Sequence, residues 1–312
     1  MSAIRSVLLH LDALPASTAR LGFARALALR HEATLSAMFV GSPPQWPLQM
    51  AFTESPAALM QPVDWAAADR TKSLFDKASA TGGVAMRWLD NDRADTVTVF
   101  CRQALYADLL VLGQHDPGAA SAGGVAKGFV ESVLIDTDKP ALILPFEGEF
   151  QTAGNDVLIG WNATPQAARA VTAAMPWLRR ARRVHVLEAS DEAAQHRAGE
   201  LDISQYLQFH GVAATLHRRR ASPTEGGDFL LSLASEVGAD LLVVGCYGHS
   251  RGKDVRATAT CRPRHDTREP FTVAAWQQVG ALQSRMQLPS HAMRQAITQR
   301  RRPATAGRRR YC

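Results

Sequence analysis

Short apolar runs alternate with longer amphipathic stretches along most of this chain. The runs at 6–11, 34–40, 84–89, 107–113 and 140–145 are rich in Val, Leu and Ile and lack a regular polar alternation. This pattern is typical of strands covered on both faces of a parallel sheet. Between the first two runs, Leu21, Ala24, Leu27 and Ala28 are spaced to form one apolar helix face.

The pattern occurs twice. SVLLHLDALPAST at 6–18 resembles DVLIGWNATPQAA at 156–168, and ADLLVLG at 107–113 returns as ADLLVVG at 239–245. Two matches in the same order indicate a duplicated unit of about 150 residues, a length typical of one domain. In the second copy, Thr164 is a candidate N-cap for the stretch that starts at Pro165.

Strand–helix alternation in each copy predicts an α/β protein with two tandem doubly wound, Rossmann-like domains. We expect the domains at 1–150 and 151–276, the second one degenerate after 251, and a disordered basic tail at 277–312. Ligands of such folds bind at the carboxyl ends of the strands. This rule places Asp12 near Gly113, and Asn162 near Gly245.

Charge and cysteine content limit the functional classes. The net charge of +6 is misleading, because thirteen arginines and one lysine face only three acidic residues after position 250. Basic charge confined to a tail is a weak argument for nucleic-acid binding. The chain has no apolar run of the roughly 18 residues that a membrane span needs. The four cysteines show no paired spacing, which favours free thiols and a cytoplasmic protein without a metal site.

A strand that ends in Asp, followed later by a strand that enters a glycine turn, resembles the universal stress protein family. The most specific piece is DLLVVGCYGHSR at 240–251, and the likeness covers about residues 4–251. The tandem copies are similar to the two-domain members of the family. The resemblance implies five-stranded parallel sheets of the adenine-nucleotide-hydrolase-like type, paired domains or a homo-oligomer, and a role in stress adaptation.

The resemblance also implies a candidate nucleotide site in each copy, for ATP or AMP. In the nucleotide-binding branch of the family, the Asp contacts the adenosine part and the glycine loop wraps the phosphates. Backbone N–H groups at such a loop attract anions. The matching residues here are Asp12, Gly113, Asn162, Gly245, Gly248, His249 and Ser250.

The first copy departs from that motif. Asp116 stands at the second glycine position, where it would repel a phosphate. Phe129 replaces the hydroxyl residue that would close the cradle, and Gly123 and Gly124 are out of register. We therefore expect no ATP binding in the first copy.

The second copy keeps its glycines but carries Asn162 in place of the Asp. An Asn can accept a hydrogen bond but lacks the negative charge. After Arg251 the glycine turn and the apolar helix of the pattern are missing, although DTREPFTVAAW at 266–276 resembles DTDKPALILPF at 136–146. This similarity predicts that a strand resumes near Phe271. A change of reading frame after Arg251 and a natural divergent extension are alternative explanations.

Three hypotheses for the function follow. The first is a regulatory or binding protein of the stress type with eroded ATP motifs and no catalytic residues. The second is a nucleotide-binding protein with slow ATPase activity in the second copy, for which no acidic or metal-binding group is evident in GCYGHSR. The third is a truncated or frame-shifted product without function. The strand PALILP at 140–145 is the expected pairing edge, toward the second copy or toward another chain.

Overall fold

A computed structural model describes residues 4–41, 65–90, 96–116, 123–147, 153–190, 200–220, 226–246 and 272–277. Strands and helices alternate through these ranges. The strands are β1 Ser6–Leu11, β2 Thr34–Phe39, β3 Met86–Leu89, β4 Leu109–Gly113, β5 Ala141–Leu144, β6 Asp156–Trp161, β7 Arg183–Ser190, β8 Thr215–Arg220, β9 Leu241–Cys246 and β10 Thr272–Gln277. The helices are α1 Ala16–His31, α3 Trp65–Ala80, α4 Thr96–Ala104, α5 Phe129–Thr137, α6 Pro165–Leu178, α7 Ile203–Phe209 and α8 Gly226–Val237.

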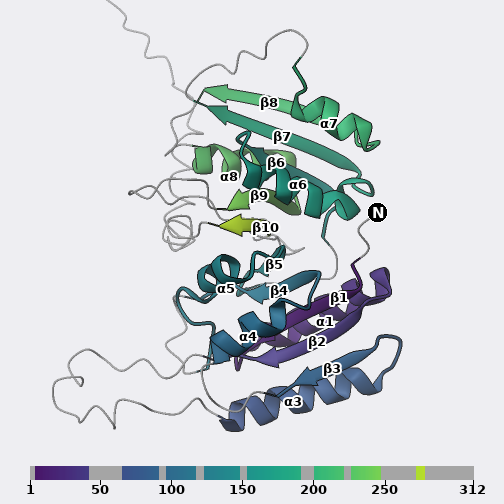
Figure 1. Ribbon diagram of the computed structural model, residues 1–312, viewed down its shortest axis with the longest axis vertical. Coiled ribbons are helices and arrows are strands. Elements are labelled where there is room, and N and C mark those ends of the chain that lie inside the picture. Colours follow the sequence, from purple (N-terminus) through teal and green to yellow (C-terminus); the bar gives the residue numbers. More distant parts are fainter. Residues whose placement is uncertain are drawn as a thin grey trace, which may run out of the picture.

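These strands form one sheet in the order β3-β2-β1-β4-β5-β10-β9-β6-β7-β8. Neighbours within β1–β5 are parallel, and so are neighbours within β6–β10. The two halves meet where β5 and β10 pair antiparallel. Figure 1 shows the sheet running from β8 at the top to β3 at the bottom, with this joint in the middle. The order of the second half mirrors that of the first, which confirms the prediction of two doubly wound α/β units.

The repeated ADLL motif has a structural role at the opposite end of the strands from the candidate sites. The Asp108 carboxylate accepts hydrogen bonds from the backbone N–H groups of Arg5 (2.8 Å) and Ser6 (2.9 Å). In the second unit, Asp240 accepts from the backbone of Gly154, Asn155 and Asp156 at 2.9–3.1 Å. The carboxylate thus satisfies backbone donors where the neighbouring strand begins.

Side-chain caps fix the starts of two helices in the second unit. The Thr164 hydroxyl accepts a hydrogen bond from the Ala167 backbone N–H at 3.3 Å, and Pro165 occupies the first helical turn. This confirms the predicted N-cap of α6. Asp202 and Gln205 form a reciprocal capping box at α7.

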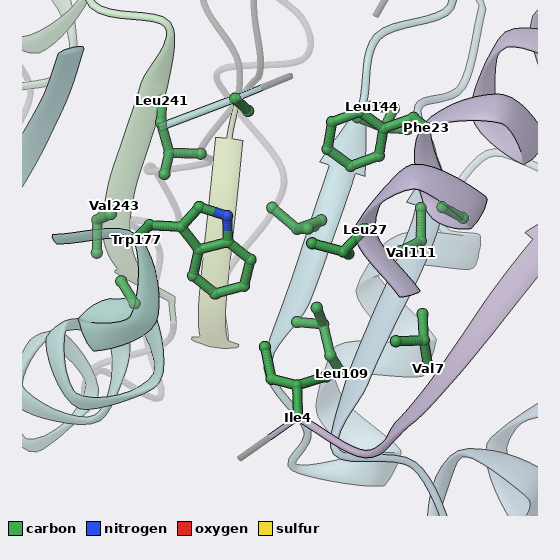
Figure 2. Packing of buried hydrophobic residues seen from close by; sticks show 14 of the residues in the cluster. Ile4, Val7, Phe23, Leu27, Leu109, Val111, Leu144, Trp177, Leu241 and Val243 are labelled. Atoms are coloured by element: carbon green, nitrogen blue, oxygen red, sulfur yellow. The ribbon is translucent and has the colours of Figure 1, made fainter. Parts of the chain in front are cut away.

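Two apolar layers enclose the sheet and continue through both units. One layer contains buried residues of α1, α3, α6 and α7, and the other contains buried residues of α4, α5 and α8. Trp177, which is 4% exposed, belongs to the first layer. In Figure 2 its indole lies between Leu241 and Val243 of the second unit and Leu27 and Leu109 of the first. The units therefore share a core.

The predicted strand near Phe271 is confirmed by β10. β10 pairs parallel with β9 and antiparallel with β5, where Thr272, Val273 and Ala274 lie opposite Ile143, Leu142 and Ala141. The expected pairing of the PALILP strand with the second copy is thereby confirmed within the chain. Residues 247–271, which include the motif-poor segment after Arg251, lie outside the described residues. The part of the chain that is described contains no helix long and apolar enough to cross a membrane.

Removal of β10 is expected to cause self-association. A chain that ends at Pro270 leaves the hydrogen-bonding edges of β5 and β9 without their shared neighbour, and an unpaired strand edge is a template for pairing with another chain. Light scattering after size exclusion is expected to show a larger assembly than for the matched control that ends at Gly280. The control keeps β10 and loses only the following residues. Equal masses for the two truncated chains would contradict the pairing role of β10.

Candidate functional site

Asp12 directly follows β1, at the carboxyl edge of the sheet, and its side chain is already fully engaged. The residue is 1% exposed. Its Oδ2 accepts hydrogen bonds from Nη1 (3.1 Å) and Nη2 (3.0 Å) of Arg20, and its Oδ1 accepts from the Leu14 backbone N–H at 2.7 Å. Both side chains of this ion pair are almost completely buried. Asp12 is therefore a partner of Arg20 and is not presented to solvent.

The Arg20 guanidinium, which comes from α1, also covers Gly113 at the end of β4. A Cβ atom on Gly113 would lie only 2.3 Å from Cζ of Arg20. Arg20 Nη1 donates a further hydrogen bond to the His10 carbonyl oxygen at 2.9 Å. Asp12 lies near Gly113, because β1 and β4 are neighbouring parallel strands. The space between them is occupied by a side chain of the protein.

His10 in β1 is the third member of this buried cluster. Its Nε2 donates to the Val40 carbonyl oxygen at 2.9 Å, and its Nδ1 accepts from Arg20 Nη1 (3.2 Å) and from the Gly113 backbone N–H (3.4 Å). These partners require a neutral ring. Burial and the charge of Arg20 lower the pKa of His10 to about 4, against the opposing effect of Asp12.

The same electrostatics keep Asp12 ionised. Burial by itself would raise the pKa of the Asp12 carboxyl, but the charge of Arg20, together with His10 and the hydrogen bonds, holds it below its ordinary value. The cluster is thus a buried carboxylate–guanidinium pair beside a neutral imidazole. Each charge of such a pair needs its hydrogen-bond partners, because a buried charge without a partner destabilises the folded state.

Aromatic and backbone contacts close the rest of this site. Phe129, the first residue of α5, is 2% exposed and packs on the His10 ring with centroids 4.4 Å apart. The loop after β4 contacts the loop after β1 directly, because Gly123 O accepts from the Ala13 N–H at 2.9 Å. A Cβ atom on Gly124 would lie 2.9 Å from the Leu14 side chain. These two glycines allow the loops to approach each other.

The corresponding edge of the second unit is built differently. In register with His10, Asp12 and Arg20, the second copy has Gly160, Asn162 and Ala170, so the buried cluster is not repeated. Asn162 is exposed, and its Oδ1 accepts a hydrogen bond from the Thr164 hydroxyl at 2.7 Å.

Gly245 lies against the start of α6. A Cβ atom there would be 2.3 Å from the Ala167 backbone nitrogen. Asn162 directly follows β6, and Gly245 is the next-to-last residue of the neighbouring strand β9. Gln166 Oε1 is buried at this edge without a hydrogen-bond partner among the described residues. Gly248, His249 and Ser250 lie outside the described residues. Within the described ranges, no cluster of three or more His, Cys, Asp or Glu side chains could hold a metal ion.

His10 and Arg20 were not among the site residues predicted from the sequence. A signal was present, because Arg20 occupies the face of α1 that also carries Leu27 and Ala24, and a charged residue on an apolar face needs a buried partner. His10 likewise interrupts an otherwise apolar strand.

Comparison with known proteins identifies the fold. No family model and no curated protein matches the sequence. A universal stress protein structure from Archaeoglobus fulgidus DSM 4304 matches with a TM-score of 0.55 and 14% identity, over 77% of this chain and 84% of that one. A putative universal stress protein from Pseudomonas aeruginosa UCBPP-PA14 matches with a TM-score of 0.50 and 13% identity, over 88% and 94% of the two chains. The chain therefore has the fold of universal stress proteins.

Loss of Arg20 is expected to destabilise the protein strongly. Arg20→Met leaves Asp12 buried and unpaired, and we expect a loss of about 3–5 kcal/mol in the free energy of unfolding. Asp12→Asn combined with Arg20→Met is expected to be less damaging than Arg20→Met alone, because no unpaired charge remains. Urea denaturation provides the measurement.

The matched control for this ion pair is the exposed pair of Lys72 and Asp76, whose nitrogen and oxygen atoms are 3.0 Å apart. Lys72→Met is expected to change the free energy of unfolding by less than about 1 kcal/mol, as is usual for exposed pairs. If Arg20→Met costs no more than Lys72→Met, the buried pair does not hold this edge together.

Acid is expected to destabilise the protein through His10. Its pKa is about 4 in the folded chain and about 6.5 when unfolded, so the unfolded chain binds the additional proton as the pH falls from 6.5 to 4. This difference amounts to roughly 3 kcal/mol, which is present above pH 6.5 and lost by pH 4. His31 and His185 also have lowered pKa values, so the comparison of the wild type with His10→Gln isolates the contribution of His10. An NMR titration of the His10 ring with a midpoint above pH 6 would contradict this assignment.

Proposed function

We propose that this chain is a regulatory binding protein of the universal stress type whose first unit does not bind nucleotide. The proposal rests on one observation above all, that the Arg20 guanidinium fills the space between Asp12 and Gly113. An adenosine-binding carboxylate must be accessible to the ligand, whereas Asp12 is buried and both of its oxygens already accept hydrogen bonds from the protein.

The cost of opening the first unit supports the same proposal. A nucleotide at this edge would have to displace Arg20 and separate the Ala13–Gly123 hydrogen bond. If Arg20 is displaced, the carboxylate of Asp12 is left buried without its partner. This costs several kcal/mol, which the binding free energy of the ligand would have to offset. Phe129 adds an apolar ring at the position where a hydroxyl would close a phosphate site. The first unit thus acts as a scaffold in this proposal.

The second unit is the candidate for weak nucleotide binding. Asn162 is exposed there, and the Oε1 of Gln166, buried at the same edge, has no hydrogen-bond partner among the described residues. Asn162, Thr164, Gln166 and Gly245, which the described structure gathers at this edge, are all uncharged. Because none of these four offers an acid or a base, we propose binding without catalysis. A slow ATPase would need a group from outside them.

The antiparallel joint between the units also bears on whether the chain forms a dimer. Since β5 pairs with β10 of the same chain, we propose that intramolecular pairing takes the place of a dimer contact at this edge. A cytoplasmic location belongs to the same proposal, because it suits a chain whose cysteines have no paired spacing.

Photolabelling of the full chain tests the nucleotide assignment. With 8-azido-ATP and Mg²⁺, peptides from 1–150 are expected to remain unlabelled, and any label is expected in peptides from the second unit. Asn162→Ala is expected to reduce that label, and excess ATP to remove it. Specific labelling next to Asp12 with micromolar affinity would overturn the proposal.

A further inference from the structure

Two histidines of the second unit face each other at the end of the sheet, away from the candidate site. His185 lies in β7 and His217 in β8. Nδ1 of His185 is 3.0 Å from Nε2 of His217, and the ring centroids are 5.2 Å apart. In the parallel register, His185 lies opposite Thr215 and Leu187 opposite His217, so the two rings are diagonal neighbours on one face.

This contact requires at least one deprotonated nitrogen. In a hydrogen bond between two rings, one nitrogen donates and the other accepts. If both rings are fully protonated, two N–H groups and two positive charges meet at the same short distance. Protonation of both histidines therefore replaces an attractive contact with repulsion.

The surroundings also disfavour the charged form. Burial, then His217 and Arg183, lower the pKa of His185, and Asp156 opposes them. Nε2 of His185 is buried without a hydrogen-bond partner among the described residues. A proton there would be a buried donor with nothing to accept it.

The charged groups on each neighbouring strand and helix offer little compensation. On β6, Asp156 is ion-paired with Arg182 and Arg183, and on β7, Glu188 is ion-paired with Arg218 of β8 at 3.1 Å. The rest of β8 adds only positive charge, from Arg219 and Arg220. The charged residues of α8, the helix on this face, are Asp228 and Glu236, whose side chains are exposed.

β8 is an edge strand. Among the described strands it is last in the order and pairs with β7 alone, as Figure 1 shows at the top of the sheet. Detachment of β8 consequently breaks no other strand pair. Edge elements of this kind open locally at a lower free-energy cost than central strands.

We propose that the His185–His217 pair makes β8 an acid-released edge, which is attached to β7 at neutral pH and detaches when both histidines are protonated. In the detached strand the two rings no longer meet, so each can take up a proton without repulsion from the other. The attached strand disfavours the doubly protonated pair and therefore binds fewer protons, so acid favours detachment. The device operates while the central strands remain folded, and it is independent of nucleotide binding.

Hydrogen–deuterium exchange on the full chain tests this proposal. After correction for the pH dependence of intrinsic exchange, the protection of the β8 amides is expected to fall about tenfold or more between pH 7.5 and pH 5, since each unit of pKa difference changes the opening equilibrium about tenfold. β3, the opposite edge strand, carries no histidine and is the internal control for general acid destabilisation. A fall restricted to β8 is the expected result.

His217→Gln keeps a polar side chain but cannot titrate, so its β8 protection is expected to fall clearly less than that of the wild type between pH 7.5 and pH 5. If this variant does not fold at pH 7.5, His185→Gln and His217→Asn are measured in its place. An NMR titration of the wild-type rings adds a readout that needs no substitution. Unchanged β8 protection in the wild type, an equal fall in a folded variant, or both rings titrating above pH 6 would overturn the proposal.

Discussion

The buried ion pair between Asp12 and Arg20 organises the carboxyl edge of the first unit. An aspartate at the carboxyl end of a central strand is the usual place for a ligand contact in a doubly wound sheet. Here a guanidinium from the next helix occupies that place, 3.0 Å from the carboxylate and directly over Gly113. His10 completes the cluster as a neutral acceptor, and Phe129 packs on its ring. A position that could recognise a ligand has thus become part of the core.

The two units share one arrangement of strands, the frame, but have different residues at the carboxyl edges of their sheets. The frame depends on features that both copies keep, namely apolar strands and an acid that accepts backbone hydrogen bonds where the next strand starts. Neither feature lies at the carboxyl edge, so the two units share one strand order although their carboxyl edges differ. His10, Asp12 and Arg20 of the first unit stand in register with Gly160, Asn162 and Ala170 of the second. This separation of frame and site is the general basis for functional divergence on one fold.

Much of the fold could be predicted from the sequence because it depends on local patterns. The apolar runs, the Thr164 cap and the repeat that points to β10 are all visible in short windows. The site was harder, because its chemistry depends on pairs distant in sequence. Asp12 and Gly113 were correctly placed together, but a motif shows which residues are present and not which of them are already bonded to each other. Arg20 and Phe129 fill the site from two different helices, and only the packed structure reveals this.

The antiparallel joint between β5 and β10 has a consequence for biosynthesis. β5 is complete at Leu144, whereas its partner β10 begins only at Thr272. During translation the first unit leaves the ribosome with an open strand edge for the time needed to add more than a hundred further residues, at about 5–20 residues per second. During this interval, other nascent chains on the same messenger RNA expose an identical strand edge. Crowding on a polysome is the setting in which this molecule is most prone to pair with the wrong copy.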